Sequence, residues 1–368
     1  MRLIAAGPFP PHRGGISQFG MKLADVLEAR VQVSRVGFSR LYPRAFFPGV
    51  SQFDPPGGAS ITAFATMDSC SPLSWRRTRR ELSRLGADAA VVQWWHPFFA
   101  PALDRSLPPE REVRRVAVCH NIHPHEGFPM GRAVARWFLG KAEALVVHSA
   151  ADEERARALL PRARILRLFH PIYDQYLAYD RGRQSARSGL GYGDDERVIL
   201  FFGLVRPYKG VEDLIEAFRE MPGDCRLLLA GECYSGAEDL RKALEAPGTA
   251  SRARWDERFV PDSEVWAYFR AADLVVLPYR SATQSGVAQI ALSFGRPMVL
   301  TRTGGLPELI EEGRTGFLAE PGSPESLAGA ISRALDLPRG AEMEERVAEV
   351  ASRFGWDRYA DSLLELIR

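Results

Sequence analysis

Cysteine is scarce in this sequence, and the spacing of the few that occur excludes two kinds of site. The four cysteines are spread along 368 residues, and no two of them have the C-x-x-C spacing of a zinc or redox centre. We therefore expect neither a disulfide framework nor a thiolate metal site, and a reducing compartment such as the cytoplasm fits this composition. Strong charge of one sign is also missing. The formal net charge of +2 is too small to indicate a nucleic-acid partner.

Long apolar runs are missing as well. No stretch reaches the roughly 18 apolar residues that a membrane-spanning helix needs. The apolar start, 1–7, is too short for a signal segment and is better explained as a first buried strand. The sequence also lacks the G-x-G-x-x-G and Walker motifs, which disfavours a dehydrogenase and a P-loop enzyme.

What the sequence does contain is a regular alternation of short apolar runs with segments of helical period. This alternation predicts parallel sheets that are covered by helices on both faces. The expected strands of the first half are 3–6, 31–36, 89–93, 113–119, 145–148 and 165–168, and those of the second half are 197–202, 225–230, 273–278, 298–301 and 316–319.

The alternation weakens in the middle of the chain. Residues 180–196 are rich in glycine and polar side chains, and this composition predicts a linker or loop. We therefore predict an α/β protein of two doubly wound domains, over 1–177 and 185–350. The terminal segment 354–368 has the pattern of an amphipathic helix.

Two basic residues follow the first strand of the second half. Arg206 and Lys209 stand between this strand and a helix that begins at Val211. Open α/β sheets bind ligands at the carboxyl ends of their strands, and two cations beside a helix N-terminus suit a diphosphate. Spacing alone leaves the alternative that both are ordinary solvated cations.

Glycine-rich turns follow two later strands of the same half. Ser285 and Gly286 begin a helix whose first amides suit a phosphate or a sugar hydroxyl. Gly304 and Gly305 permit a close approach of the backbone to a ligand. Tight turns and a helix cap are the alternative explanation for both segments.

The first half offers a comparable set of residues. Gly14 and Gly15 precede a helix over 16–28 and can supply amides to a phosphate. His120 and Asn121 follow the strand 113–119, so both are expected at its ligand edge. His120 suits a polar contact to a sugar, or a structural hydrogen bond at the strand end.

Two neighbouring clusters are open to several interpretations. His123, His125 and Glu126 form a histidine-rich loop, but no H-E-x-x-H helix accompanies it, so a metal site is not expected. Trp95 and His96 end a strand at the ligand edge and suit stacking on an acceptor sugar, or plain core packing.

Together these segments resemble the family-four retaining glycosyltransferases of the GT-B fold. Residues 202–210, 230–232, 273–278 and 294–308 resemble the family's F-x-G-R/L-x-x-x-K-G, AGxG, ADxxxxPS and A-x-G-x-P-V-V-x-x-x-x-G-G-x-x-E segments, and 14–15, 118–121, 146–150 and 354–356 fall where relatives carry similar ones. The resemblance implies two Rossmann-like domains facing across a cleft. The domain over 1–177 would lie on the acceptor side, the one over 185–350 would bind the donor, and the helix 354–368 would return to the first.

The resemblance also implies a reaction. A retaining glycosyltransferase would move a hexose-type sugar from a UDP- or GDP-linked donor to a glycan, lipid-linked or small-molecule acceptor, without a metal ion or other cofactor. Arg206 and Lys209 would stabilise the departing diphosphate, and His120 would be the third catalytic residue. The donor-binding residues implied are Gly14, Gly15, Gly203, Gly231, Glu232, Gln284, Ser285, Gly286, Val287 and Glu308, and the acceptor contacts are Asn121, Trp95 and His96.

The sequence departs from the family pattern at one place. Ala282 and Ile290 occupy the positions where the family usually has two glutamates. Gln284, Ser285 and the helix-start amides are the candidates to replace them, and Gln289 is adjacent to the second position. The alternatives of a nucleotide-sugar 2-epimerase and of a non-catalytic sugar-nucleotide-binding homologue therefore stay open.

Basic and aromatic residues are mixed in two segments of the first half, 75–80 and 132–141. Such mixtures are typical of a surface helix that touches anionic lipid at the inner face of a membrane. An ordinary amphipathic helix with snorkelling arginines is the alternative. The oligomeric state is not predicted by the sequence.

Overall fold

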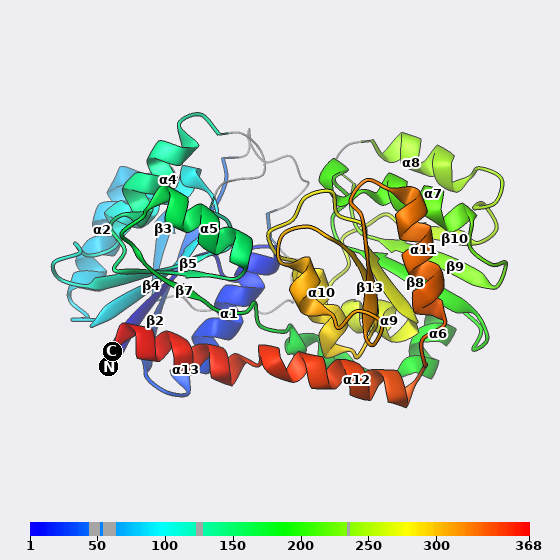
Figure 1. Ribbon diagram of the computed structural model, residues 1–368. Coiled ribbons are helices and arrows are strands. Elements are labelled where there is room, and N and C mark those ends of the chain that lie inside the picture. The colour runs from blue at the N-terminus through cyan, green and yellow to red at the C-terminus, as the bar shows by residue number, and fades with distance from the viewer. Residues whose placement is uncertain (44–51, 54–63, 123–127, 234–235) are drawn as a thin grey trace. The chain divides into compact units, whose positions relative to one another are not determined.

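The computed structural model describes residues 1–43, 52–53, 64–122, 128–233 and 236–368 (Figure 1). The chain divides into two compact units. The first comprises Met1–Phe169 and Trp356–Arg368, and the second comprises His170–Gly355. Residues 170–177, which the sequence analysis assigned to the first domain, therefore lie in the second unit.

The first unit contains a seven-stranded sheet in the order β3-β2-β1-β4-β5-β6-β7, in which each neighbouring pair is parallel. Its inner strands are continuous apolar runs, as expected where helices cover both faces of a sheet. The strands are β1 Arg2–Ala6, β2 Gln32–Arg40, β3 Ala65–Asp68, β4 Ala89–Trp94, β5 Arg114–Cys119, β6 Ala144–Val147 and β7 Arg164–Arg167.

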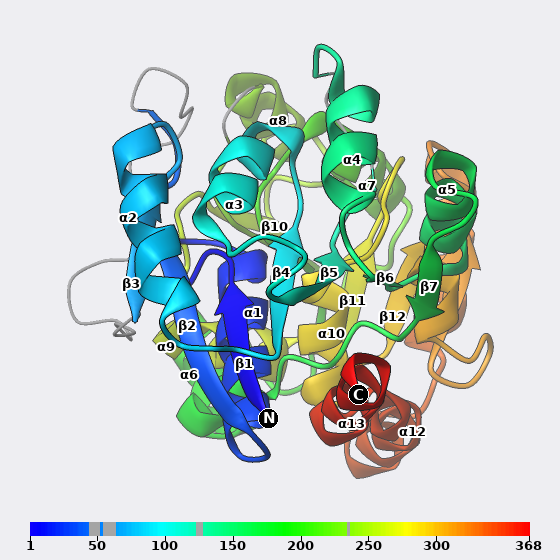
Figure 2. The ribbon, with the colours of Figure 1, turned by 90° about the vertical axis from the view of Figure 1, so that its left-hand side faces the viewer.

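The helices of the first unit lie on both faces of this sheet. Figure 2 shows α1 and α13 on one face and α2, α3, α4 and α5 on the other. Both ends of the chain belong to this unit. The helices are α1 Gly15–Glu28, α2 Pro72–Ser83, the 3₁₀ turn η2 Pro97–Phe99, α3 Ala100–Ser106, α4 Gly131–Leu139, α5 Ala150–Leu159 and α13 Trp356–Ile367.

The C-terminal helix α13 is part of the core of the first unit. Its Tyr359 and Leu363 are 0% exposed. The Tyr359 hydroxyl is 3.0 Å from Nε2 of His148. On its outer side α13 is held by Arg30, two residues beyond the end of α1, whose guanidinium pairs with Asp357 at 2.7 Å. The predicted return of this helix to the first unit is therefore confirmed.

The second unit contains a six-stranded parallel sheet in the order β10-β9-β8-β11-β12-β13. The order reverses at β8 and β11, so their carboxyl ends define the switch point where such sheets bind ligands. The strands are β8 Arg197–Phe202, β9 Cys225–Ala230, β10 Ala253–Asp256, β11 Leu274–Leu277, β12 Met298–Thr301 and β13 Gly316–Ala319.

Helices and short 3₁₀ turns connect the strands of the second unit. The 3₁₀ turns are η3 Asp174–Tyr179, η4 Pro207–Lys209, η5 Leu306–Leu309 and η6 Ser352–Phe354, and the helices are α6 Arg183–Leu190, α7 Val211–Arg219, α8 Ala237–Leu244, α9 Asp262–Ala271, α10 Gly286–Ser293, α11 Pro324–Leu335 and α12 Ala341–Ala351. The predicted loop over 180–196 is wrong in part, because α6 lies within it, bracketed by Gly182 and Gly191 with positive φ angles of 82° and 78°.

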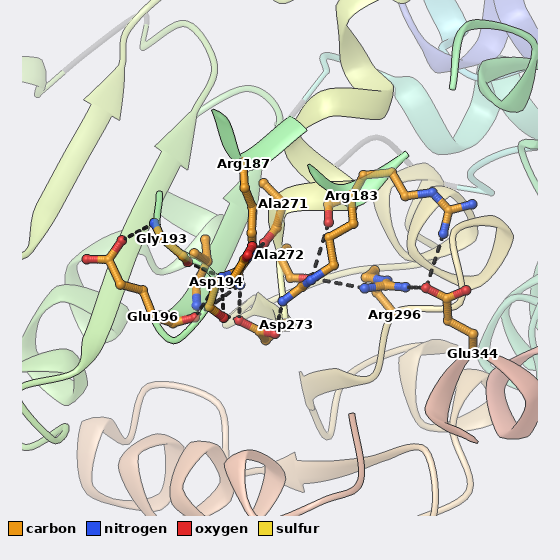
Figure 3. A network of polar contacts seen from close by, with 12 residues as sticks. Arg183, Arg187, Gly193, Asp194, Glu196, Ala271, Ala272, Asp273, Arg296 and Glu344 are labelled. Atoms are coloured by element: carbon orange, nitrogen blue, oxygen red, sulfur yellow. Dashed lines mark hydrogen bonds and ion pairs between the residues drawn. The ribbon is translucent and has the colours of Figure 1, made fainter. Parts of the chain in front are cut away.

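Helix α6 forms despite its polar sequence because buried ion pairs hold it to the sheet. Figure 3 shows Arg187 and Arg183 reaching Asp273 at the amino end of β11, at distances of 2.7 Å and 2.5 Å. Arg187 is 1% exposed and also donates to the carbonyl oxygens of Glu196 and Ala271. Burial lowers the pKa of Arg187, and the Asp273 carboxylate opposes that shift. The network lies at the amino end of β11, whereas the predicted site follows the carboxyl ends of the strands.

Candidate functional site

The turn after β8 carries the two predicted cations. Arg206 is the N-cap of the 3₁₀ turn that ends at Lys209. Gly210 then turns the chain into α7 with a φ of 61°. A Cβ atom at Gly210 would lie 2.3 Å from the Pro278 carbonyl oxygen. Glycine is therefore required here by both backbone conformation and space, and the turn is held against the carboxyl end of β11.

Lys209 is a buried cation. The residue is 9% exposed, and Nζ lies 5.2 Å from the centroid of the Tyr279 ring. Burial lowers its pKa, and the nearby Arg206 adds to that shift while Tyr208 opposes it. Among the described residues no carboxylate forms an ion pair with this ammonium. A buried charge without a counter-ion is costly, so Lys209 is suited to an anionic ligand.

Two glycines make room around this ammonium. A Cβ atom at Gly203, which has a φ of 102°, would lie 3.4 Å from Lys209 Nζ and 3.3 Å from Cγ2 of Val287. Gly231, at the end of β9, has a φ of 142°, and a Cβ atom there would lie 2.2 Å from the Gly203 carbonyl oxygen. The structure therefore brings together Gly203, Gly231, Lys209 and Val287.

Arg280 is a third cation at this edge of the second sheet, and it stabilises the loop structure. Arg280 follows β11, and its guanidinium makes two hydrogen bonds to the Asp213 carboxylate, at 2.6 Å and 2.9 Å. Its amide donates to the Tyr208 carbonyl oxygen at 2.7 Å. These bonds fix the loop after β11 to the turn that carries Lys209. The Arg280 charge is neutralised by Asp213, whereas that of Lys209 has no such partner in the described chain.

The start of α10 is more occupied than the sequence suggests. The Ser285 hydroxyl accepts a hydrogen bond from the Ala288 amide at 3.3 Å and lies 3.4 Å from the Tyr279 hydroxyl. It therefore caps its own helix. A Cβ atom at Gly286 would lie 2.6 Å from Cε2 of Tyr173, so this glycine accommodates a buried ring. Donor contacts by Ser285 and Gly286 stay a prediction that concerns their backbone amides.

The positions that replace the two family glutamates are buried and apolar. Ala282 is 6% exposed and Ile290 is 5% exposed. Gly304 packs on the first of them: a Cβ atom there would lie 2.0 Å from the Ala282 carbonyl oxygen. The Gly305 amide donates to the Thr283 carbonyl oxygen at 3.0 Å. The glycine pair thus holds the loop before α10 in place.

The other predicted residues of the second unit differ in exposure. Gln284 and Glu232 are partly buried, and Glu308 is an exposed residue of η5. The carbonyl of Glu232 accepts from the Val205 amide at 2.8 Å, which aligns the loops after β8 and β9. Gln289 is 0% exposed, and its amide atoms have no hydrogen-bond partner among the described residues.

In the first unit the predicted glycines lie at the start of α1. Gly14 is the N-cap with a φ of 115°, and no heavy atom lies within 4 Å of the place a Cβ atom would take. The helix begins at Gly15 without a side-chain cap. The first amides of a helix carry a partial positive charge. Phosphate binding by this N-terminus stays a prediction.

His120 lies at the end of β5, where its ring is held by two neighbours. Its Nε2 is 2.5 Å from Oε1 of Gln93, a residue of β4. The ring of Phe19 meets it edge-on with 4.8 Å between centroids. Gln93 was not predicted from the sequence. The available signal was a glutamine inside an otherwise apolar strand.

The predicted acceptor contacts also have structural tasks. Asn121 donates to the Trp95 carbonyl oxygen at 3.5 Å. Trp95 is 7% exposed, and its ring centroid lies 4.4 Å from that of Phe99. His96 accepts from the Phe98 amide through Nδ1 at 3.2 Å. Their acceptor roles stay predictions.

Among the described residues, no cluster of three or more His, Cys, Asp or Glu side chains is arranged to hold a metal ion. The histidine-rich loop raised in the sequence analysis, His123, His125 and Glu126, lies outside the described residues.

Comparison with known proteins identifies one domain of the chain. The family model described as Glycosyl transferases group 1 matches residues 196–336. The chain carries a glycosyl transferases group 1 domain. This domain contains the whole β8–α7 turn with Arg206 and Lys209, together with the glycine-rich turns after β11 and β12.

Two curated proteins resemble the chain around this group 1 domain. An alpha-D-kanosaminyltransferase of Streptomyces kanamyceticus is 31% identical over 242 residues, which cover 63% of this chain and 60% of that protein. A D-inositol 3-phosphate glycosyltransferase of Mycobacterium bovis is 32% identical over 239 residues, covering 62% and 49%. The matched part thus spans only about half to three fifths of the length of these relatives.

The fold as a whole is that of GT-B proteins. A crystal structure of the Anabaena protein Alr3699/HepE in complex with UDP-glucose matches all of this chain and all of that chain with a TM-score of 0.76, at 18% sequence identity. The predicted fold class, two Rossmann-like parallel-sheet units of GT-B type with the group 1 domain in the second, is confirmed.

Proposed function

We propose that the chain is a glycosyltransferase that moves a hexose-type sugar from a UDP- or GDP-linked donor to an acceptor. The carrying observation is the Lys209 ammonium, which is buried at the switch point of the second sheet, has a lowered pKa and has no carboxylate counter-ion among the described residues. A nucleotide diphosphate supplies the missing negative charge. The relatives named above are transferases, and one structural neighbour was crystallised with UDP-glucose.

The proposed chemistry places the cations where negative charge develops. Cleavage of the bond between the anomeric carbon and the diphosphate leaves both electrons on a phosphate oxygen. Lys209 and Arg206 would stabilise that charge, and the amides at the start of α10 would add to it. A transition state that carries more charge than the ground state is then bound more tightly, and this difference lowers the barrier.

The finer features of the reaction belong to the same proposal. The anomeric configuration is retained, as in the family that the sequence resembles, and the two cations do the work that a metal ion would otherwise do. His120 contacts the sugar, and the acceptor is a glycan, a lipid-linked sugar or a small molecule. Transfer is favoured over 2-epimerisation by the transferase relatives.

A thermal-shift panel of UDP, GDP, ADP and their sugars tests the donor part of this proposal. One diphosphate series is expected to raise the melting temperature, and Arg206→Ala and Lys209→Ala are expected to reduce that shift and the transfer rate together. Full transferase activity in either variant would contradict the leaving-group role. Isomerisation of the donor without an acceptor would favour the epimerase, and donor binding without turnover would favour a non-catalytic homologue.

We further propose that helix α4 contacts anionic lipid. No helix of the described chain is long and apolar enough to cross a bilayer. Nevertheless Trp137 of α4 is 41% exposed, and Met130, the N-cap of this helix, is 78% exposed. Arg132 and Arg136 of the same helix are also exposed. Apolar and basic side chains on one face suit an anionic surface. Cosedimentation with phosphatidylglycerol vesicles, but not phosphatidylcholine vesicles, is expected, and Trp137→Ala should weaken it. Equal binding to both kinds of vesicle, or none, would contradict the contact.

A further inference from the structure

Tyr279 is a buried aromatic residue that follows the carboxyl end of β11 in the second unit. It is 3% exposed, and its ring lies against the Lys209 ammonium, with 5.2 Å between Nζ and the ring centroid. An aromatic face carries negative charge density and attracts a cation, most strongly where both groups are shielded from water. The ring is therefore an attractive partner of Lys209 that carries no formal charge.

The position of the Tyr279 ring is fixed by its neighbours. Its hydroxyl lies 3.4 Å from the Ser285 hydroxyl at the start of α10, and its carbonyl oxygen accepts a hydrogen bond from the Thr301 hydroxyl of β12 at 2.5 Å. The Tyr208 ring of the turn η4 meets it at an interplanar angle of 75°, with 6.4 Å between centroids. Contacts from three different elements of the second unit thus hold the ring beside the ammonium.

The other described groups around Lys209 include no carboxylate that forms an ion pair with it. On its own turn, Arg206 disfavours the ammonium and Tyr208 favours it. The loop after β8 and helix α10 contribute Gly203 and Val287 to the surroundings, and neither residue has a side chain that can carry a charge. The aromatic face of Tyr279 can therefore offset part of the cost of burying this charge.

We propose that Tyr279 is a positioning residue that keeps Lys209 in its charged form before a ligand binds, by presenting its ring face to the ammonium. Tyr279 touches Lys209 and acts through it. The consequence for diphosphate binding rests on the proposed function, whereas the charge of Lys209 in the free protein does not. A neutral amine must first take up a proton, so the affinity for a diphosphate is reduced by the fraction of the protein that is uncharged at this position.

The charge of Lys209 can be measured in the full chain without any ligand. The chain has lysine at four positions, 22, 141, 209 and 242. The NMR spectrum of protein with isotope-labelled lysine is therefore simple, and Lys209→Met assigns the signal. In a pH titration, Tyr279→Leu should move the midpoint of the Lys209 signal to lower pH by about one unit, the size expected when a shielded cation–π contact is lost. Tyr279→Phe keeps the ring face and should keep the wild-type midpoint. The exposed Lys242 serves as the internal reference, and its midpoint should not move.

Graded fluorination separates the charge density of the ring face from the volume of the ring. Fluorine atoms withdraw electron density from a phenyl face and change its size little. Phenylalanines with increasing numbers of fluorine atoms, introduced at position 279 by nonsense suppression, should therefore lower the Lys209 midpoint stepwise from its value in Tyr279→Phe. A ring that only fills space would give the same midpoint throughout the series. This series carries the decision if Tyr279→Leu does not fold, as judged by circular dichroism.

Binding of UDP supplies the functional readout. Titration calorimetry measures the affinity of the wild type and of Tyr279→Leu at several pH values. The ratio of the two affinities is followed, because the ionisation of UDP itself cancels in it. This ratio should rise about tenfold between a pH below both Lys209 midpoints and a pH above both, since only the ammonium attracts the diphosphate. Burial raises the pKa of Tyr279 to about 12, so its phenol stays neutral below that pH.

The two hypotheses fail in different ways. If neither UDP nor GDP binds the wild type at any pH, the proposed function is refuted, and the Lys209 titration still decides the role of Tyr279. An unchanged midpoint in Tyr279→Leu and throughout the fluorinated series overturns the positioning role and leaves diphosphate binding standing. A lowered midpoint with an affinity ratio that is constant with pH refutes the link between this ring and binding.

Discussion

The exchange Lys209→Met separates the role of the charge from that of the side-chain volume. Methionine has a similar length and is apolar, so it fits a site in which the lysine is 9% exposed and stacks near the Tyr279 ring. Because burial disfavours the ammonium and lowers its pKa, the free variant should be at least as stable as the wild type. If Lys209 were purely structural, the Lys209→Met variant would show the same gain in stability and no loss of UDP binding.

The loss on the ligand side can be worked out from electrostatics. An ammonium and a phosphate charge about 4 Å apart interact by about 4 kcal/mol at an effective dielectric constant near 20. That energy corresponds to roughly a thousandfold change in dissociation constant. UDP at 100 times the wild-type dissociation constant adds about 2.7 kcal/mol to the stability of the wild type, but a thousandfold weaker variant would gain only about 0.06 kcal/mol.

Thermal denaturation with and without UDP, supported by titration calorimetry, measures both effects. Lys242→Met is the matched control, because Lys242 is an exposed lysine of α8 in the same unit. It should leave the UDP-induced shift unchanged. A Lys209→Met variant that binds UDP as tightly as the wild type would refute the reasoning, and so would a strong loss of stability in the absence of UDP.

Four further predictions concern stability. Arg187→Met should lower the free energy of unfolding by about 3–5 kcal/mol in urea denaturation, because it leaves the buried Asp273 carboxylate with one partner fewer; a loss under about 1 kcal/mol would contradict this. Leu363→Ala should cost about 2–5 kcal/mol, since α13 belongs to the first core, and a neutral effect would show that the helix is dispensable. Gln289→Leu should raise stability by about 1 kcal/mol, because its amide has no partner among the described residues, and a lower melting temperature would reveal one. Burial lowers the pKa of His170 to about 4, so the folded state binds fewer protons than the unfolded state between pH 4 and 6.5. Stability is therefore full above about pH 6.5 and falls as the pH decreases towards 4, by about 1.3 kcal/mol between pH 7.5 and 5.5 for this group alone; His170→Phe should remove that part of the difference, and an unchanged pH dependence would contradict the assignment.

Much of the fold could be predicted from the sequence because parallel strands between two helical layers are continuous apolar runs. The strands at 197–202 and 225–230 were predicted at their observed bounds for this reason. Two strands at the sheet edges were missed. Ala65–Asp68 and Ala253–Asp256 are short and contain charged residues, so no apolar run marks them. Edge strands need only one apolar face, and that weakens their signal.

The remaining errors have tertiary causes. Helix α6 was predicted as a loop because its sequence is polar and glycine-rich, and only the contact of Arg187 with the distant Asp273 explains its stability. Local sequence carries no information about that pairing. In the same way, the sequence suggested that Gly286 leaves its amide accessible to a ligand. The space beside this glycine is filled by the ring of Tyr173, which is far away in the chain.

In the candidate site, too, local features could be predicted and tertiary contacts could not. The glycines and cations after β8 could be identified because turn chemistry is local. The burial of Lys209 against Tyr279 could not be predicted, because the two residues follow different strands. Gln93 was overlooked because its partner, His120, belongs to the next strand.

The proposed function depends on a diphosphate being held at Lys209, and a crystal structure of the protein grown with UDP tests this most directly. We predict a phosphate oxygen within about 3.2 Å of Lys209 Nζ, the distance of a charge-assisted hydrogen bond. Electron density that places the diphosphate away from this ammonium, with Lys209 still enclosed beneath Tyr279, would contradict it.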